Sequence, residues 1–470
     1  MKRIFYSILL SLAFIAPQPI QAAFNLFTWF EDRLTMTDIS QTSITPIAAL
    51  HKPTSIAQLQ TLVVSSNKPI AVAAGRYSQG GQIAYPDGIV IDITDLNKVV
   101  RLDTTNKEIT VETGITWRAI QNYIDAYNLS IKVMQSYNDF TVGGSLSVNV
   151  HGRDIHYGPL IETVTSIKVL LADGSIVTAS RTENPDLFAG AIGGYGALGI
   201  IIEATISLTE NYKIEQDIKQ MPIEAYQKHF ESVKNNPRVI FHNANLYPTD
   251  YKKVSSITWY RTDKKLTTSD SLQEVKKFYP FHALAEQILR RFSFAQKVRP
   301  KIDTKQMPVV ALRNYEMSST VNTLEPLLRF PTTTVLQEYF IPMAKLLPFI
   351  NEVRALADIY DINILNISIR YIPQNHESIL SYARNESFSL VFYINILNTQ
   401  TGLKESQIWT QRLINAAILQ GGTYYLPYQL FGTQEQIKKA YPRFDELVNL
   451  KKKYDPAGKF SNCLLKKYFQ

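Results

Sequence analysis

Apolar positions in the N-terminal half of the chain switch repeatedly between helical and strand spacing. Between Ser55 and Ser65 they recur every three or four residues, which predicts a short amphipathic helix with Thr54 or Ser55 as its N-cap. A second helix is predicted from Trp117 to Tyr127. Short runs rich in β-branched residues predict strands at 70–74, 88–93, 99–103, 109–113, 164–171, 175–179 and 200–208.

The pair Asp173-Gly174 between two of these strands predicts a hairpin closed by a type I′ turn. In the middle of the chain, residues 212–412, the pattern predicts an antiparallel sheet backed by helices. The strands of this sheet are expected at 238–246, 254–260, 335–341, 364–371 and 387–396.

Two glycine-rich segments adjoin the predicted strands. Residues Gly75–Gly81 directly follow the strand at 70–74, an arrangement that presents backbone N–H groups to a pyrophosphate. Residues 193–199 contain four glycines and lead directly into the strand at 200–208. The first segment is neither a GxGxxG nor a Walker A motif, so a nicotinamide-binding Rossmann site and a P-loop are not supported.

The stretch from Met134 to Gly158 contains a third glycine turn, followed by a His-Gly-Arg triplet. Gly143 and Gly144 are expected to adopt positive φ and to let the backbone approach a flat or phosphorylated ligand. Residues Ser145–Val150 alternate small, apolar and polar side chains, which predicts a strand beside that ligand. The alternative is a glycine turn ahead of a core strand, with His151 at the surface.

The composition, with 45% hydrophobic and 19% charged residues, is that of an ordinary globular protein. The net charge of +8 comes from scattered Lys and Arg residues without zinc-ligand spacing or an RNA-recognition motif, which argues against nucleic acid as a partner. The seven histidines show no metal-ligand spacing, so no metal site is expected. Because Cys463 is the only cysteine, an intrachain disulfide is excluded.

The N-terminus has the pattern of a secretory signal peptide at residues 1–22. Lys2 and Arg3 precede an apolar run from Ile4 to Ala16, and cleavage is expected after Ala22. The run is shorter than the ~20 residues that span a bilayer, and an uncleaved membrane anchor is the alternative. The sequence therefore predicts an exported protein, periplasmic or secreted.

Residues 281–299 combine apolar positions at helical spacing with several basic side chains. This pattern predicts either a helix packed on the sheet of the middle segment or a peripheral contact with an anionic membrane. The packed helix is the more common outcome of such a pattern.

Several motifs along the chain occur in an order found in one group of flavoproteins. They are AAGRYSQGG, IVIDITDLNKV, ITVETGITW, DFTVGGSLSVNVHG, VLLADGSIV, NPDLF and GGYGALGIIIEATISL. In this order they resemble the FAD domain of the vanillyl-alcohol-oxidase superfamily. The His-Gly-Arg triplet and the C-terminal segment are most similar to its sugar-acting branches, the aldonolactone and alditol oxidases and decaprenylphosphoryl-ribose oxidase.

The resemblance implies an α+β fold with a two-subdomain PCMH-type FAD-binding domain at 46–211. Residues 413–470 would return to complete that domain, and 212–412 would form a substrate or cap domain built on an antiparallel sheet. The residues implied around FAD are Ala74, Gly75, Arg76, Tyr77, Ser78, Gln79, Gly80, Ser136, Thr141, Val142, Gly143, Gly144, Ser145, Asn149, His151, Ile201 and Tyr424.

The resemblance also implies oxidation of a secondary alcohol of a sugar, polyol, lactone or lipid-linked sugar by hydride transfer to flavin N5. Tyr428 and His151 are the two candidate bases for the hydroxyl proton. Arg370 would anchor a polar or anionic substrate group and would lower the pKa of Tyr428. Other strand residues either contact the substrate or form solvated strand faces, and they are Gln337, Tyr339 and Asn366.

Two departures from the family pattern concern the flavin and the substrate. Members with a covalent flavin carry a histidine where this chain has Tyr77, and bicovalent members add a cysteine that this chain lacks. Pro427 falls where decaprenylphosphoryl-ribose oxidase has a lysine, and the His-Trp-x-Lys signature of aldonolactone oxidases is absent. The FAD is therefore expected to be non-covalent, while the substrate and the electron acceptor (oxygen, a quinone or a protein) are left open. An exported, non-catalytic ligand-binding protein of the same fold is the alternative function.

We predict that acid precipitation releases all of the flavin colour into the supernatant. A phenol with a pKa of ~10 is mostly protonated at neutral pH, so Tyr77 is a far weaker nucleophile than imidazole or thiolate. The variant Tyr77→His, which keeps the neighbouring Arg76 and Ser78, is expected to retain flavin in the acid pellet. Flavin fluorescence that stays with the wild-type band on a denaturing gel would contradict this prediction.

Overall fold

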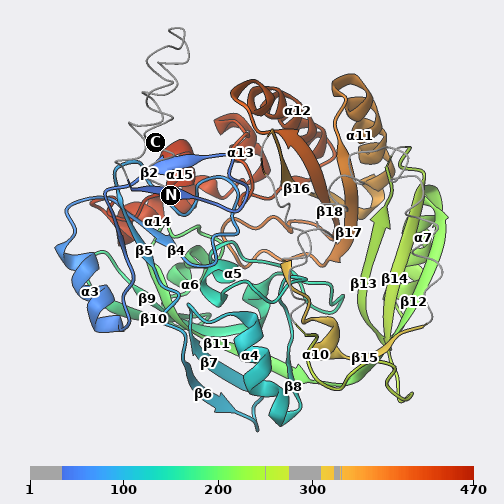
Figure 1. Cartoon of the computed structure of the whole chain (residues 1–470), viewed down its shortest axis with the longest axis horizontal. Coiled ribbons are helices and arrows are strands. Elements are labelled where there is room, and N and C mark those ends of the chain that lie inside the picture. Colours follow the sequence, from blue (N-terminus) through green and yellow to red (C-terminus); the bar gives the residue numbers. More distant parts are fainter. Residues whose placement is uncertain (1–33, 249, 275–307, 322–328, 330, 470) are drawn as a thin grey trace, which may run out of the picture.

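The computed structural model describes residues 34–248, 250–274, 308–321, 329 and 331–469. This part of the chain contains four β-sheets and the helices that cover them (Figure 1). The expected signal peptide at 1–22 and the basic segment at 281–299 lie outside the described residues. None of the described helices is long and apolar enough to cross a membrane.

The first described residues build two small sheets. A two-stranded sheet and a three-stranded parallel sheet are formed by β1 (Thr35–Thr37) with β2 (Ile44–Pro46), and by β3 (Ala49–His51), β5 (Ile89–Asp92) and β4 (Ile70–Ala73) in that order. Helix α3 (Ile56–Ser65) packs on the parallel sheet with Leu59 and Val63 buried. Its N-cap is Ser55, whose hydroxyl accepts a hydrogen bond from Gln58 N, so the expected helix and cap are confirmed.

A six-stranded antiparallel sheet follows, with the order β10-β9-β11-β7-β6 and with β8 paired to β11. Its strands are β6 (Val99–Asp103), β7 (Glu108–Glu112), β8 (Leu129–Ile131), β9 (Val164–Leu170), β10 (Ile176–Ser180) and β11 (Ile200–Glu210). Helix α4 (Trp117–Ile124) continues as the 3₁₀ turn η1 (Asp125–Tyr127), which confirms the helix expected up to Tyr127. Helix α6 (Pro185–Ala191) packs against β9 and β10.

The hairpin between β9 and β10 forms as expected, but its turn differs. Leu170 pairs with Ile176, so residues 171–175 connect the strands, and within this loop only Gly174 has positive φ, at +87°. Gly174 N donates to Leu171 O, which gives a four-residue turn that ends in a left-handed glycine. The expected type I′ turn is wrong, because that turn needs positive φ at both central residues.

The segment after Thr141 differs most from the sequence-based expectation. Instead of a glycine turn followed by a strand at 145–150, it forms helix α5 (Val142–Ser147), and Thr141 Oγ1 accepts the capping hydrogen bond from Gly144 N. Gly143 and Gly144 are helical residues, so the positive φ expected for them is wrong.

Two local features explain why this segment is a helix. Val142 and Leu146 are four residues apart and both fully buried, which is helical spacing, and Thr141 is a good N-cap residue. The alternation of small and apolar residues resembled strand spacing only because the helix is too short to show its own period.

The middle of the chain forms an eight-stranded antiparallel sheet with the order β15-β12-β14-β13-β17-β18-β16-β19. Its strands are β12 (Lys213–Pro222), β13 (Val239–Leu246), β14 (Lys253–Arg261), β15 (Val310–Leu312), β16 (Thr332–Pro342), β17 (Ile364–Ile372), β18 (Ser387–Leu397) and β19 (Thr423–Tyr424). Helices α7 (Ile223–Lys234), α11 (Leu346–Tyr360) and α12 (Gln400–Leu419) cover one face of it (Figure 1). The expected antiparallel sheet backed by helices is confirmed, including all of its expected strands.

The C-terminal residues run back from the large sheet to the first sheets. Strand β19 pairs with β16 through Tyr424 and Tyr339, and helix α14 (Phe444–Tyr454) packs on α6. Near the end of the chain, Phe460 forms a bridge with Ile70 of β4. The remaining helices and 3₁₀ turns are α10 (Arg313–Glu316), α13 (Gln434–Ala440), α15 (Cys463–Tyr468), η2 (Leu160–Thr163) and η4 (Met343–Lys345).

We expect Gly143→Ala to lower the midpoint of thermal unfolding. A Cβ at Gly143 would lie 3.1 Å from both Cβ and the carbonyl oxygen of Thr113, and forcing a methyl group into such a contact costs ~1–3 kcal/mol. Gly144→Ala is the matched control, because a Cβ there closely approaches only the side-chain oxygen of Thr141 and alanine favours a helix. Equal midpoints for the two variants in calorimetry would contradict this packing explanation.

Candidate functional site

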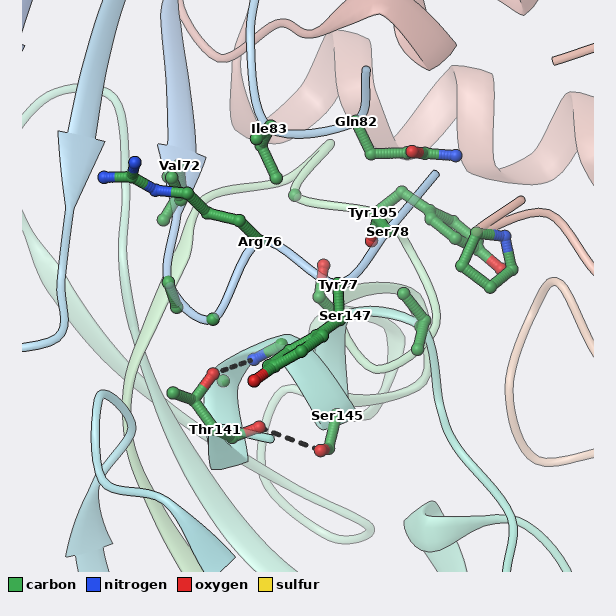
Figure 2. Close-up of a pocket in the computed structure, with 18 of the residues that line it drawn as sticks. Val72, Arg76, Tyr77, Ser78, Gln82, Ile83, Thr141, Ser145, Ser147 and Tyr195 are labelled. Carbon is green, nitrogen blue, oxygen red and sulfur yellow. Dashed lines mark hydrogen bonds between the residues drawn. The ribbon is translucent and has the colours of Figure 1, made fainter. Parts of the chain in front are cut away.

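A deep cleft opens where the loop after β4, helix α5 and the C-terminal segment meet (Figure 2). It holds about 1470 Å³ of space not filled by protein atoms, part of which is open to solvent. Residues along its walls include Ala74, Gly75, Arg76, Tyr77, Ser78, Gln79, Thr141, Gly143, Gly144, Ser145, Ile201, Tyr425 and Tyr428.

The loop at residues 75–78 lines the cleft with unpaired backbone groups. Among the described residues, none of its four backbone N–H groups donates to a protein acceptor. Arg76 has a left-handed φ of +60°, and its guanidinium is turned away from Tyr77 to donate to Asp92 Oδ2 at 2.8 Å (Figure 2). Burial alone would raise the pKa of Asp92, but hydrogen bonds from Thr94 and Arg76 lower it, so the anchoring carboxylate stays ionised. Successive unpaired N–H groups form an anion-binding surface, and this loop fits a pyrophosphate.

Gln79 ties this loop to two other parts of the chain. Its backbone N donates to Pro427 O at 2.8 Å. Its side-chain Oε1 accepts hydrogen bonds from Leu336 N at 2.8 Å and from Gln429 Nε2 at 3.2 Å. The loop after β4, the edge of β16 and the C-terminal segment are therefore held together at one residue.

The remaining walls also fit FAD, the cofactor implied by the sequence. A Cβ at Gly75 would lie 2.9 Å from the Tyr77 ring, so the glycine lets that ring fold back over the loop. Gly143 and Gly144 leave the cleft-facing part of α5 without side chains, and the hydroxyls of Thr141 and Ser145 lie beside them (Figure 2). Bare backbone beside hydroxyl groups suits a flat ring system that needs polar partners at its edge.

Beyond one wall of the cleft, Tyr428 contacts a buried carboxylate on the large sheet. Tyr428 Oη donates to Glu338 Oε2 at 3.1 Å, while His151 Nε2 and Ser389 Oγ donate to Glu338 Oε1, each at 2.5 Å. The side chains of Glu338 and His151 are each only 3% exposed. Arg370 on β17 is the register partner of Ser389 on β18. These five residues form what we call the carboxylate cluster.

The cluster favours an ionised Glu338 and a protonated Tyr428. Burial alone would raise the pKa of Glu338, but His151, Arg370 and the hydrogen bond from Ser389 lower it below the ordinary value of 4.5. Burial raises the pKa of Tyr428 well above its usual range and Glu338 raises it further, which outweighs the opposing effect of Arg370. Arg370 thus lowers the pKa of Tyr428 as expected, but burial and Glu338 outweigh its effect. The phenol is a hydrogen-bond donor to a carboxylate.

Comparison with known proteins identifies the domain that builds the cleft. Residues 47–180 match the family model described as an FAD binding domain. The chain carries a PCMH-type FAD domain. It is similar to L-gulonolactone oxidase from Mus musculus, with 22% identity over 429 residues that cover 89% of this chain and 94% of that protein. The resemblance to the sugar-acting flavoproteins is confirmed, since these relatives are named as oxidases and dehydrogenases of sugar lactones and alditols.

Two further relatives match over a smaller part of the chain. Alditol oxidase from a Streptomyces species is 27% identical over 187 residues, covering 39% of this chain and 44% of that protein. The mitochondrial L-galactono-1,4-lactone dehydrogenase of Arabidopsis thaliana is 25% identical over 268 residues, covering 53% of this chain and 42% of that protein. The alignments with these two relatives thus span less than half of each relative's length.

Some residues expected around FAD are not on the cleft wall. Tyr425 lines the cleft in place of Tyr424, whose ring packs instead on Tyr441 with ring centroids 6.1 Å apart. Gln135 lines it in place of Ser136. The other expected residues that do not line it are Gly80, Val142, Asn149 and His151.

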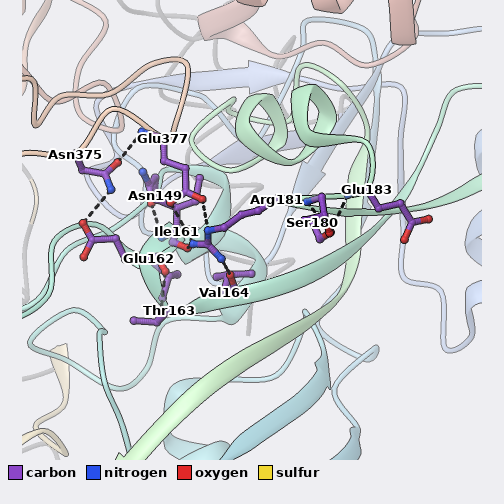
Figure 3. Close-up of polar contacts among 12 residues, drawn as sticks. Asn149, Ile161, Glu162, Thr163, Val164, Ser180, Arg181, Glu183, Asn375 and Glu377 are labelled. Atoms are coloured by element: carbon purple, nitrogen blue, oxygen red, sulfur yellow. Dashed lines mark hydrogen bonds and ion pairs between the residues drawn. The ribbon is translucent and has the colours of Figure 1, made fainter.

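Asn149 belongs to a polar network outside the cleft (Figure 3). It has a left-handed φ of +50°, and its Oδ1 accepts a hydrogen bond from Ile161 N at 3.0 Å. In the same network Glu162 accepts from Gly158 N and from Asn375 Nδ2, at 2.8 and 2.9 Å. Asn149 therefore shapes the chain between α5 and β9, and its expected place at the flavin edge stays a prediction.

The three strand residues expected to contact substrate lie on different faces. Tyr339 is fully buried on the helix-covered face of β16, where its ring packs on Phe349 of α11 at 5.6 Å, so it faces away from the cleft, contrary to expectation. Gln337 shares that face and donates to Gln429 Oε1 at 2.9 Å. Asn366 lies on the opposite, half-buried face, the one that carries Arg370 on the same strand.

Glu338 is not among the site residues predicted from the sequence. A carboxylate between Gln337 and Tyr339 in a strand of otherwise apolar residues is a usable signal, because a fully buried Glu is rare unless it is paired. Strand alternation places Glu338 on the opposite face from Gln337 and Tyr339. Its pairing with His151 could not be predicted from the sequence, because the two residues are brought together only by the tertiary structure.

We expect Gln79→Leu to weaken FAD binding and to lower the thermal midpoint. The substitution leaves Leu336 N without its acceptor and loosens the loop that lines the cleft, and a buried unsatisfied N–H costs ~1–3 kcal/mol. Gln60→Leu is the matched control, since Gln60 bonds only to Gly174 O, away from the cleft. FAD dissociation constants from fluorescence titration that are equal for the two variants would contradict the assigned role of Gln79.

Proposed function

We propose that this protein is an FAD-dependent oxidoreductase that oxidises a secondary alcohol of a sugar, polyol, lactone or lipid-linked sugar. The observation that carries the proposal is the junction between the FAD-domain cleft and the carboxylate cluster at Tyr428, which lines the cleft and whose hydroxyl donates to Glu338. An alcohol oxidation needs a hydride acceptor and a group that takes the hydroxyl proton, and this junction offers both at one place. The named activities of the relatives support the same class of reaction.

The residues that would hold FAD are those of the cleft wall. The N–H groups of residues 75–78 would bind the pyrophosphate, α5 with Thr141 and Ser145 would position the flavin ring, and the backbone at Ile201 would hold the adenine end. Bound FAD supplies the hydride acceptor. Because Tyr77 is the residue in the covalent-attachment position and burial raises the pKa of Tyr77 to about 12, its phenol stays protonated and the FAD is non-covalent.

The residues beside the substrate would orient its hydroxyl and remove its proton. Tyr428 lines the cleft, and its hydroxyl would accept a hydrogen bond from a substrate hydroxyl while it donates to Glu338. Arg370 contributes the positive charge that keeps Glu338 ionised, and its anchoring of a substrate group stays a prediction. Among the described residues no group of His, Cys, Asp and Glu side chains could hold a metal ion, and the proposal uses none.

The alternative of a non-catalytic binding protein is not favoured. A pure binding site needs no ionised carboxylate held at 3% exposure behind its wall, since burying one costs several kcal/mol unless its partners compensate. An exported location remains part of the proposal, supported by the pattern at residues 1–22. The electron acceptor is proposed as oxygen, a quinone or a protein.

We expect at least one sugar, polyol or lactone alcohol to bleach the flavin absorbance of the purified protein under anaerobic conditions. A compound deuterated at the carbinol carbon should bleach it more slowly, because the C–H bond breaks in the step observed. The same compound with its hydroxyl group methylated is the control and should cause no bleaching. Unchanged flavin spectra across sugars, polyols and lactones would favour the binding-protein alternative.

A further inference from the structure

We propose that the carboxylate cluster is a proton relay in which Tyr428 passes the proton of the substrate hydroxyl on to Glu338. The inference rests on the proposed function, and it names the acceptor atom that the function requires, Glu338 Oε2. Neither of the two candidate bases suggested by the sequence, Tyr428 and His151, is then the final acceptor. Tyr428 is the catalytic residue that touches the substrate, and His151 is a positioning residue.

The hydrogen bonds of the cluster have the order that a relay needs. Tyr428 lines the cleft, whereas Glu338 and His151 do not. Tyr428 therefore lies between the cleft and Glu338, and its hydroxyl donates to Glu338 Oε2 at 3.1 Å. The other carboxylate oxygen, Oε1, is already occupied by His151 and Ser389 at 2.5 Å each. Oε2 is thus the oxygen that faces the cleft side of the cluster and is available to receive a proton.

The backbone around Glu338 fixes the carboxylate in place. Its carbonyl oxygen accepts a hydrogen bond from Tyr425 N at 2.9 Å, next to the β16–β19 pairing. The His151 ring packs edge-on against Phe340 at 5.6 Å and Tyr382 at 5.9 Å. Because the side chains of Glu338 and His151 are each only 3% exposed, the proposed proton route runs through side chains.

The transfer balances with one carboxylate and one phenol. The hydroxyl proton of the substrate moves to Tyr428 Oη as the phenol's own proton moves to Glu338 Oε2, which becomes a carboxylic acid. Bound FAD would supply the acceptor for the hydride of the carbinol carbon, so that the alcohol would become a ketone. The carboxylic acid then returns its proton to solvent by the reverse path when the product leaves.

Charges around the cluster allow this route at neutral pH. Within the described part of the chain, the titratable and charged groups that face Glu338 are His151, Arg370, Tyr382, Tyr425, Tyr428 and Tyr441. Burial raises the pKa of each of these four tyrosines, so they stay protonated. Because the pKa of Glu338 is lowered, its carboxylate is ionised at neutral pH and can accept a proton. Activity should therefore be present at neutral pH and be lost only as the pH falls through that lowered pKa.

The first test compares flavin reduction in Glu338→Gln and Tyr428→Phe with the wild type. Both variants keep the size of the side chain, and we expect each to reduce the flavin 10²–10⁴-fold more slowly while retaining bound FAD, the usual range for lost proton transfer. The double variant should be no slower than the slower single variant, because both changes interrupt one path. In Glu338→Gln the loss of rate at acid pH should disappear, and Glu338→Asp should recover part of the rate.

The matched control is Glu162→Gln. Glu162 is a half-buried carboxylate in the polar network that lies outside the cleft. Its flavin reduction should match the wild type, including the pH profile. A rate loss in this control equal to that of Glu338→Gln would mean that any lost carboxylate disturbs the fold, which would overturn the relay.

The second test needs no turnover. Acid titration of the FAD-free protein followed by infrared spectroscopy should show the C=O band of a protonated Glu338, and Glu338→Gln should lack it. Tyr428→Phe removes a donor to the carboxylate and should raise the titration midpoint by ~0.5–1 pH unit. An unmoved midpoint would overturn the relay. Wild-type flavin that no alcohol bleaches would contradict the proposed function instead, while bleaching that Glu338→Gln does not slow would contradict the relay alone.

Discussion

A single buried carboxylate, Glu338 on β16, holds three distant parts of the chain together. It receives hydrogen bonds from His151 after α5, from Ser389 on β18 and from Tyr428 after β19. Removing one partner from a buried ion pair typically costs ~3–5 kcal/mol, because the remaining charge is left uncompensated. The FAD domain, the large sheet and the C-terminal segment must therefore keep their mutual positions for Glu338 to stay ionised. The same requirement fixes the wall of the cleft, since Tyr425 and Tyr428 belong to that segment.

Much of the architecture could be predicted from the sequence because its signals are local. Helix α3 is predicted by Leu59 and Val63, which lie at helical spacing after a serine N-cap. The strands of the large sheet are predicted by runs of β-branched residues. The loop at 75–78 could also be placed at a ligand site, because a glycine-rich loop directly after a strand presents backbone N–H groups to a ligand, and in the structure it lines the cleft. Such features depend on neighbours within a few residues.

The features that were predicted wrongly or missed depend on contacts between residues far apart in the sequence, or on segments too short to show a pattern. Helix α5 is six residues long, so its apolar spacing gives too few positions to distinguish a helix from a strand, and its cap decides the outcome. Tyr425 replaced Tyr424 at the cleft because adjacent residues point in opposite directions, and only the register of β19 on β16 selects between them. Glu338 and His151 are 187 positions apart in the sequence, and nothing near either residue indicates the other.

The junction at Gln79 has a consequence for how the protein is made. Its hydrogen bond with Gln429 joins residues 350 positions apart. At a synthesis rate of ~5–20 residues per second, the second partner leaves the ribosome roughly 20–70 s after the first. During that interval the loop at 75–78 has neither the Pro427 carbonyl nor the Tyr425 and Tyr428 side chains beside it. A nascent chain thus cannot enclose its cofactor, and loading with the flavin nucleotide becomes an event of the completed polypeptide.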